Sequence, residues 1–310
     1  MTPNPGEAQG DLAVPAAATA GMGLPGEVGT RAEALPPRPV TELLRALAAD
    51  RHGVGAFNVV LLEHAEAIVA GAAEAGLPTL LQISENCVRY HGALRPIVAS
   101  CRELAASCPV PVFVHLDHIT DRRLVEEGLA AGVDSVMFDG SKLPYDENVA
   151  ATAAVVRACH ARGVSVEAEI GEVGGKDGVH APGVRTRPGE AAQFALATGV
   201  DALAVAVGTS HAMTSRTASV DHDLISRIAA AVAVPLVLHG SSGVPDGDLA
   251  KAVAAGMTKV NISTHLNKLF TGEIRRVLGP DPDVVDPRKY VAPARTVVAA
   301  EVARLLRLLA

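Results

Sequence analysis

A carboxylate and an imidazole stand side by side at the end of an apolar run, as Asp117-His118 after residues 112–116. The run lies between Pro111 and Thr120-Asp121, and this pattern predicts a buried strand that leads into a helix. An ionised carboxylate is costly to bury alone, so such a pair is usually exposed, paired or bound to a metal. Taken alone, the run is explained most simply by a capping aspartate beside a surface histidine.

Two further histidines, His211 and His239, also follow predicted strands. Three neutral imidazoles that leave one position open form a ligand set typical of catalytic zinc. Ligands spaced this widely cannot be assigned from spacing alone, and His115 competes with His118 because both lie on one strand. Alternation along that strand places His115 on the face of Asp117, deeper in the sheet.

Glycine- and serine-rich loops contain the two later histidines, at residues 207–211 and 239–243. Backbone N–H groups in such loops can bind an anion without a cationic side chain. Ordinary turn chemistry would explain either loop on its own. Next to two candidate metal ligands, a phosphate site is the better interpretation.

From residue 40 onward, the sequence alternates short β-rich runs with amphipathic segments. Strands are predicted at residues 54–58, 79–84, 112–116, 135–138, 164–169, 202–207, 236–239 and 258–262. Helices are predicted at residues 62–75, 94–107, 121–131, 146–161, 188–198, 221–232, 246–255 and about 294–309, with another beginning near Thr41. This order favours an α/β fold, a closed (β/α)8 TIM barrel, in which parallel strands are joined by right-handed crossovers. An open doubly wound sheet is the alternative, although Val59-Val60-Leu61 stands where its glycine-rich loop would follow the first strand.

Every predicted strand ends in polar or ionisable residues. In chain order these are Asn58, Ser84, Asp117-His118, Asp139-Ser141, Glu169, His211, His239-Gly240 and Asn261. The active site of a TIM barrel lies at the carboxyl ends of its strands. We therefore expect these side chains to converge at one mouth of the barrel.

Composition narrows the classes of function. The chain has 310 residues, of which 49% are hydrophobic and 3% aromatic, and a net charge of −7 without a basic run, a balance that disfavours nucleic acid as a partner. No apolar run reaches the ~18–20 residues of a membrane helix. Four cysteines without a C-x-x-C pair predict a reducing, cytoplasmic location.

We expect residues 1–39 to form a flexible, disordered tail, because they are rich in Ala, Gly and Pro and lack periodicity. The tail has no basic start joined to a compact apolar region, so it is a poor secretory signal. Residues 40–310 are expected to form a single barrel domain.

The order of these motifs resembles that of the class II, zinc-dependent ketose-bisphosphate aldolases, nearer to the tagatose-bisphosphate branch. The matching motifs are Gly55-Ala56-Phe57-Asn58, His115-Leu116-Asp117-His118, residues 135–141, Glu167-Ala168-Glu169-Ile170-Gly171, residues 207–211, residues 238–243 and Lys259-Val260-Asn261-Ile262. The resemblance implies a TIM-barrel lyase of carbohydrate metabolism and glycolysis that uses Zn²⁺. Homo-oligomers, dimers or tetramers, are common in this family.

The resemblance also implies a role for individual residues. His118, His211 and His239 match the zinc ligands, and Glu169 matches a carboxylate close to the metal. Asp117 matches the base that removes the C4 hydroxyl proton, and Asn261 matches the donor to the zinc-stabilised enediolate. The substrate-side and phosphate-binding positions are matched by Asn58, Ser84, Gly208, Gly240, Ser242 and Thr264. In relatives, the phosphate loops also hold a monovalent cation, Na⁺ or K⁺.

Four positions depart from the family pattern. Asp177 stands where a glutamate usually protonates the enediolate, so either Asp177 takes that role or the acid lies elsewhere. Ala212 replaces a glycine, which would cost about 1 kcal/mol if the position needs a positive φ. Ser241 replaces a smaller residue, and His265 stands where the branch often has glutamate. These changes bear on activity level and substrate choice more than on reaction type.

Fructose 1,6-bisphosphate, cleaved to dihydroxyacetone phosphate and glyceraldehyde 3-phosphate, is the first substrate hypothesis, and tagatose 1,6-bisphosphate is the alternative. A non-catalytic barrel subunit that supports a partner aldolase is a second class of function. A Schiff-base aldolase that uses Lys142 or Lys259 is a third. Arg288 could meet a distal phosphate, or it could be an ordinary surface residue.

Overall fold

The structure is a computed structural model that describes residues 38–170, 185–209, 216, 218–281 and 283–310. The predicted tail, apart from Arg38 and Pro39, lies outside these residues, and so do Asp177, His211 and Ala212. Residues Leu35–Ala310 group into one compact unit.

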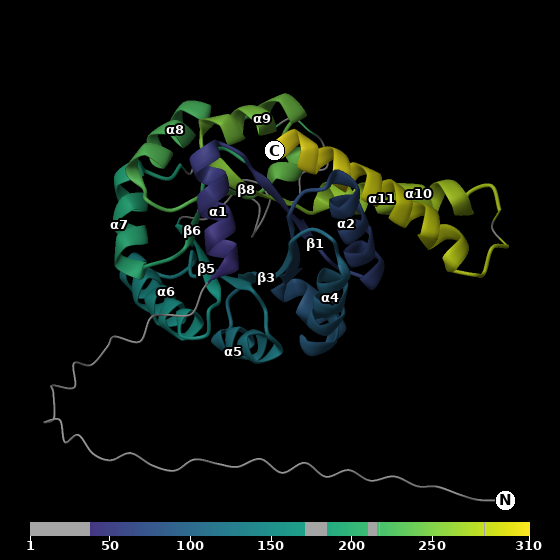
Figure 1. Cartoon of the computed structure of the whole chain (residues 1–310), viewed down its shortest axis with the longest axis horizontal. Coiled ribbons are helices and arrows are strands. Elements are labelled where there is room, and N and C mark those ends of the chain that lie inside the picture. The colour runs from purple at the N-terminus through teal and green to yellow at the C-terminus, as the bar shows by residue number, and fades with distance from the viewer. Residues whose placement is uncertain (1–37, 171–184, 210–215, 217, 282) are drawn as a thin grey trace, which may run out of the picture. The chain divides into compact units, whose positions relative to one another are not determined.

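Eight parallel strands close into a barrel in sequence order, which confirms the predicted (β/α)8 fold (Figure 1). The strands are β1 (Val54–Asn58), β2 (Thr79–Ser84), β3 (Val112–Ile119), β4 (Ser135–Phe138), β5 (Ser165–Ile170), β6 (Ala202–Val205), β7 (Leu236–Leu238) and β8 (Met257–Ile262). Closure is made by β8 and β1, where Val54 lies opposite Lys259 and Ala56 lies opposite Asn261. β3 extends beyond the predicted run to Ile119, and this extension contains Asp117 and His118.

Helices alternate with the strands and surround them (Figure 1). They are α1 (Pro39–Asp50), α2 (Leu62–Ala75), α3 (Glu85–His91), α4 (Arg95–Ser107), α5 (Arg122–Ala131), α6 (Tyr145–His160), α7 (Pro188–Thr198), α8 (His222–Ala231), α9 (Asp246–Ala255), α10 (Thr264–Leu278) and α11 (Arg288–Leu309). The short helix α3 was missed by the sequence pattern. The final helix begins at Arg288 and continues through Pro293, so it starts about six residues before the predicted start near residue 294.

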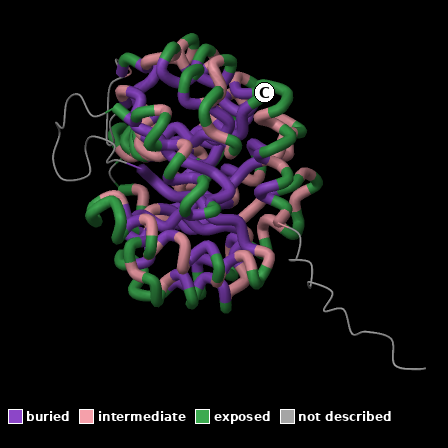
Figure 2. The backbone as a smooth tube through the Cα atoms, turned by 90° about the vertical axis from the view of Figure 1, so that its left-hand side faces the viewer, coloured by how far each residue is buried: buried purple, intermediate pink, exposed green. Residues whose placement is uncertain are grey.

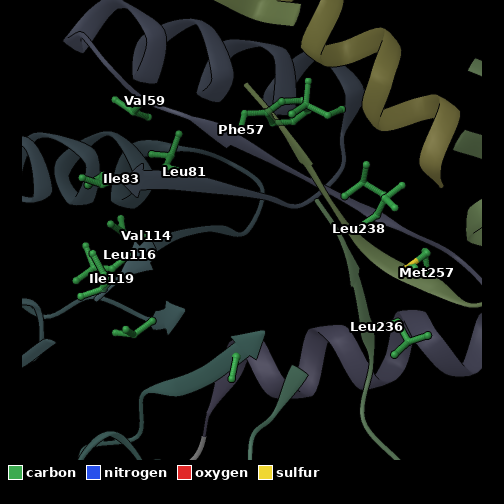
Figure 3. Packing of buried hydrophobic residues seen from close by; sticks show 14 of the residues in the cluster. Phe57, Val59, Leu81, Ile83, Val114, Leu116, Ile119, Leu236, Leu238 and Met257 are labelled. Carbon is green, nitrogen blue, oxygen red and sulfur yellow. The ribbon is translucent and has the colours of Figure 1, made fainter. Parts of the chain in front are cut away.

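Two groups of apolar side chains make up the core. The larger group lies between the strands and the outer helices; Figure 3 shows Leu81, Ile83, Val114 and Leu116 of neighbouring strands within it. The smaller group joins α1 to the inside of the barrel. It consists of Val40 and Leu44 of α1 and of the strand residues Val54, Ala56, Leu80, Ala202, Ala204 and Val237. The strands are accordingly buried along most of their length, while exposed residues lie at the periphery (Figure 2).

Helix α1 covers the amino-terminal end of the barrel. Its Val40 and Leu44 are buried against the inner group, and Thr41 binds the hydroxyl of Ser165, the first residue of β5, through both its backbone N–H at 3.1 Å and its own hydroxyl at 2.7 Å. With that end covered, only the carboxyl ends of the strands can form an accessible mouth.

The inward positions change from apolar to polar along the strands. β1 changes from Val54 and Ala56 to Asn58, and β2 changes from Leu80 to Gln82. Buried polar groups are stable only when they are hydrogen-bonded, so this half of the barrel must hold an ordered polar network.

Candidate active site

A β-bulge in β3 brings two consecutive residues to the mouth. Leu116 and Ile119 both belong to the outer apolar group, although regular alternation would place residues three apart on opposite faces. The register with β4 shifts between them, since Leu116 lies opposite Val136 and Ile119 lies opposite Phe138. The extra residue is His118, whose φ is +51°. Asp117 and His118 can therefore both face the inside of the barrel.

His118, His239 and Glu169 come together as a candidate metal centre. One potential ligand atom from each lies within 4.8 Å of the others, and the two imidazole rings meet edge to face with centroids 4.7 Å apart. The three residues come from β3, β5 and the end of β7. The third predicted histidine ligand, His211, lies outside the described residues.

Carboxylates fix the orientation of both imidazoles. Nδ1 of His118 lies 2.9 Å from Asp139 Oδ2, and Nε2 of His239 lies 2.9 Å from Glu167 Oε1. Because an ionised carboxylate only accepts hydrogen bonds, these two nitrogens carry the protons. Nε2 of His118 and Nδ1 of His239 are then the nitrogens that can present a lone pair to a metal.

The donor set fits zinc. Neutral imidazoles with one carboxylate are ligands that Zn²⁺ prefers, and a carboxylate behind each histidine is the usual support for such a site. His115 belongs to a deeper layer, where Nδ1 lies 2.7 Å from Ser135 Oγ and Nε2 lies 3.9 Å from Glu167 Oε2. Burial, followed by the charge of Lys259, lowers the pKa of His115 well below its ordinary value, so this imidazole is neutral.

Asp117 is a buried carboxylate with one oxygen engaged. Asn58 Nδ2 donates to Asp117 Oδ2 at 2.9 Å, whereas Oδ1 accepts no hydrogen bond from the described residues and lies 3.9 Å from His118 Nε2. Burial opposes ionisation of this group, but its electrostatic interactions with His118, His239 and Lys259 and the Asn58 hydrogen bond bring its pKa below the ordinary value. Asp117 is thus ionised and can accept a proton on Oδ1.

The start of α3 anchors the segment that follows the bulge. Glu85 is 5% exposed, and its Oε2 accepts hydrogen bonds from the backbone N–H groups of Thr120 at 2.6 Å and Asp121 at 3.3 Å and from the Thr120 hydroxyl at 2.9 Å. Ser84, predicted as a substrate-side residue, caps α3 by accepting from Cys87 N–H at 3.2 Å. The β2–α3 junction therefore holds the end of β3 in place.

Both glycine-rich loops contain a glycine with a positive φ, and the loop after β7 contacts the start of α10. Gly208 and Gly240 have φ values of +115° and +66°, and a Cβ on Gly208 would lie only 2.6 Å from the carbonyl oxygen of Ser219. Ser242 Oγ accepts from the backbone N–H groups of Ser263 and His265, both at 3.3 Å. The β7 loop is thereby joined to the helix that begins at Thr264.

Two of the unusual positions make defined contacts. Ser241 donates its hydroxyl to the carbonyl oxygen of Asn261, and His265 Nε2 lies 2.7 Å from Glu301 Oε1.

Arg288 forms an ion pair with Asp286 at 2.8 Å, and its side chain is 89% exposed. Within the described residues, Arg288 therefore has a local surface partner.

Several polar residues of the site were not singled out by sequence reasoning as site residues. Glu167 and Gln82 lie on the inward faces of β5 and β2, and Glu85 stands just after the predicted end of β2. Asp139 was noted only as a polar strand end. The alternation Glu167-Ala168-Glu169 was the available signal, because two acids spaced by two residues on a buried strand must share a face.

Comparison with known proteins identifies the family. The chain matches the family model described as fructose-bisphosphate aldolase class-II over residues 38–310. The chain belongs to this family. It is also 37% identical to the fructose-bisphosphate aldolase of Geobacillus stearothermophilus over 270 residues, covering 86% of this chain and 94% of that protein. The resemblance to the class II aldolase family that the motifs indicated is thereby confirmed.

Solved structures agree on the architecture. The YdjI aldolase from Escherichia coli K12 superposes with a TM-score of 0.76 at 26% identity, covering 87% of this chain and 96% of that one. The fructose-bisphosphate aldolase of Campylobacter jejuni superposes with a TM-score of 0.72 at 20% identity, covering 87% and 93%, and at this identity supports the fold alone. Membership of the class II aldolase family implies a lyase. No helix in the described ranges is both long enough and apolar enough to span a bilayer.

Proposed function

We propose that this protein is a zinc-dependent aldolase that cleaves fructose 1,6-bisphosphate, or a closely related ketose bisphosphate, to dihydroxyacetone phosphate and glyceraldehyde 3-phosphate. The observation that carries the proposal is the cluster of His118, His239 and Glu169 directly beside the buried carboxylate of Asp117. Such a site could hold a metal through two neutral imidazoles and one carboxylate, with a base within reach of the same substrate. His211 is proposed as the remaining histidine ligand.

The residues divide the chemistry between them. Zinc, when bound, polarises the carbonyl oxygen of the ketose. Asp117 takes the proton of the C4 hydroxyl as the C3–C4 bond breaks, and the aldehyde half leaves. The Asn261 side-chain amide donates to the enediolate oxygen, as a preorganised donor does in an oxyanion hole. Protonation of C3 is assigned to Asp177, which lies outside the described residues.

The phosphate of the dihydroxyacetone half is placed in the loops that contain Gly208, Gly240 and Ser242, with Thr264 at the start of α10. Backbone N–H groups at a helix start and in glycine-rich turns are suited to this anion. Na⁺ or K⁺ is proposed as an accessory cation at these loops. Asn58 and Ser84 are proposed on the substrate side.

We place the reaction in the cytoplasm, in a homo-oligomeric dimer or tetramer. The free thiols of Cys87, Cys101, Cys108 and Cys159 support a reducing location. Burial raises the pKa values of the Cys101 and Cys159 thiols to about 12, so these two behave as inert core residues.

The test is cleavage of fructose 1,6-bisphosphate and of tagatose 1,6-bisphosphate by the purified protein before chelation, after chelation and after zinc is added back. Activity that disappears with the chelator and returns with zinc is the expected result, and the ratio of kcat/KM values identifies the sugar. Activity that resists chelation and is trapped by borohydride would instead support the Schiff-base mechanism. Stoichiometric zinc without turnover on either sugar would contradict the proposal and favour the non-catalytic subunit.

A further inference from the structure

A lysine lies at the centre of the barrel with all of its hydrogen-bonding capacity used. Lys259 on β8 is 1% exposed, and its Nζ lies 2.7 Å from Gln82 Oε1, 2.8 Å from Asn261 Oδ1 and 2.9 Å from Glu167 Oε2. An ammonium group has three N–H donors and no acceptor. Three acceptors on three different strands therefore satisfy it completely.

The first branch orients Asn261. Because the ammonium can only donate, the side-chain oxygen of Asn261 must face it. The amide nitrogen of Asn261 is then turned away from Lys259 and is the donor that this side chain can offer to substrate. Asn261 is only 9% exposed, so solvent contributes little to the orientation of its amide, and the contact with Lys259 decides it.

The second branch reaches the base through two amides. Gln82 presents its oxygen to Lys259, so its Nε2 donates onward to Asn58 Oδ1 at 3.2 Å. Asn58 must then donate through Nδ2, which it does to Asp117 Oδ2 at 2.9 Å. The direction of every bond in this chain follows from the donor-only character of the ammonium. The chain engages one oxygen of Asp117 and leaves Oδ1 to receive a proton.

The third branch reaches the candidate metal ligand. Glu167 accepts from Lys259 through Oε2 and from His239 Nε2 through Oε1. Its carboxylate therefore holds the tautomer of His239 that presents Nδ1. The Lys259 ammonium is thus connected by hydrogen bonds to the proposed enediolate donor Asn261, to the proposed base Asp117 and to the candidate metal ligand His239.

We propose that Lys259 is a positioning residue that sets the hydrogen-bond direction of Asn261, of the Gln82–Asn58–Asp117 chain and of the Glu167–His239 pair. The proposal rests on the aldolase function proposed above, because that function gives Asn261, Asp117 and His239 the roles that Lys259 would support. Lys259 itself is assigned no contact with substrate. It also accounts for a charged side chain in the barrel interior, where an apolar residue would pack at lower cost.

Two substitutions and one control test this role. Lys259→Met keeps most of the side-chain volume and removes all three donors. Gln82→Glu exchanges a single NH₂ group for oxygen and keeps an acceptor for Lys259, but it can no longer donate to Asn58. Thr258→Val is the matched control, because Thr258 is the preceding buried residue on β8 and its hydroxyl has no partner in the described part of the chain.

Kinetics of the zinc-loaded proteins give the first readout. We expect kcat to fall about 10- to 100-fold in Lys259→Met and Gln82→Glu, the range typical when the supports of a site are removed, with KM changed less than kcat and bound zinc retained. Thr258→Val should match the wild type. If Lys259→Met fails to fold, Gln82→Glu decides, because it is isosteric and retains the lysine contact. A folded, zinc-loaded variant of either kind with wild-type kcat would overturn the proposal.

The metal-free protein gives a readout that does not depend on activity. In ¹⁵N-labelled, chelator-treated wild type, the side-chain NH₂ protons of Gln82 and Asn58 should exchange slowly with solvent, and Gln82→Glu and Asn58→Asp assign their resonances. Lys259→Met should accelerate this exchange about 10-fold or more. Unchanged exchange in Lys259→Met refutes the orienting role. Inactive wild-type protein with protected amides would refute the proposed function while the hydrogen-bond network stands.

Discussion

Removal of the Glu85 carboxylate tests whether the bulge in β3 is held from outside the strand. Glu85→Ala leaves the backbone N–H groups of Thr120 and Asp121 without the acceptor that the structure shows. His118 lies two residues before Thr120, with its φ at +51°. Loss of the anchor should allow the backbone to relax from this conformation and move the imidazole away from Glu169 and His239.

The magnitude follows from two opposing terms. A non-glycine residue in the left-handed region costs roughly 1–2 kcal/mol. A hydrogen bond to a charged acceptor contributes about 1.5–3 kcal/mol, and Glu85 accepts from two backbone donors and one hydroxyl. The anchor therefore outweighs the strain, and without it the bulged conformation is no longer favoured. Release of the strain would then favour the relaxed backbone over the zinc-binding conformation by roughly the strain energy. A shift of about 1.4 kcal/mol in this equilibrium weakens zinc binding about tenfold.

Competition with a chromogenic chelator measures zinc affinity, and thermal unfolding reports the global cost. We expect zinc binding about tenfold weaker in Glu85→Ala, together with a Tm lower by roughly 2–4 °C for each kcal/mol lost. Glu126→Ala is the control, since that α5 side chain is 58% exposed and lies 3.8 Å from Arg162. Wild-type zinc affinity in a folded Glu85→Ala protein would show that the bulge is stable without this anchor, and the reasoning would be wrong.

Three further predictions concern the base, a loop and an ion pair. Asp117→Asn should retain zinc but lower the cleavage rate about 100- to 10,000-fold, and near-normal turnover would exclude Asp117 as the base. Gly208→Ala, which places a Cβ 2.6 Å from a carbonyl oxygen, should destabilise the protein by about 1–3 kcal/mol in urea unfolding, whereas Gly247→Ala, in open space on α9, should not. Burial opposes ionisation of Glu301, but hydrogen bonds from Arg304 and His265 lower its pKa to about 2. The ionised side chain therefore stabilises the fold above its unfolded pKa near 4.5, and this contribution is lost as the pH falls toward 2. The urea midpoint should therefore decline more steeply between pH 4.5 and 2 in wild type than in Glu301→Gln; parallel curves would contradict this.

Much of the fold follows from local patterns in the chain. The strands at 54–58, 79–84 and 135–138 were predicted with the bounds that the structure has, because short apolar runs lie between glycines, prolines and polar residues. Gly76, Gly132 and Gly199 end helices with positive φ shortly before the next strand, a placement typical of glycine at a helix C-terminus. A closed barrel then places all strand ends at one mouth, so the polar residues at those ends could be grouped before any contact was known.

The contacts within the mouth could not be predicted in the same way. Alternation from Leu116 would turn Asp117 inward and His118 outward. The run contains no glycine that would mark a bulge, and a positive φ is uncommon for any non-glycine residue, although histidine is among the types that adopt it more often. Glu85 was overlooked because helix α3 is too short for periodicity to reveal it. Lys259 was considered as an amine for Schiff-base chemistry, a role that its three hydrogen bonds disfavour. In each case the deciding partner is distant in sequence.

Stability and catalytic geometry share the same groups in the interior of this barrel. The carboxyl-terminal half of the barrel interior contains amides, acids and one lysine. This arrangement is stable only when each group has a hydrogen-bond partner, since a buried polar group without one costs about 1–3 kcal/mol of folding free energy. The pairing that satisfies Lys259 is also the pairing that aims Asn58 at Asp117 and holds His239 through Glu167. Alanine substitutions here would therefore confound unfolding with misorientation. Isosteric exchanges such as Gln82→Glu separate the two better, because they keep the packing while they replace a hydrogen-bond donor by an acceptor and add one negative charge.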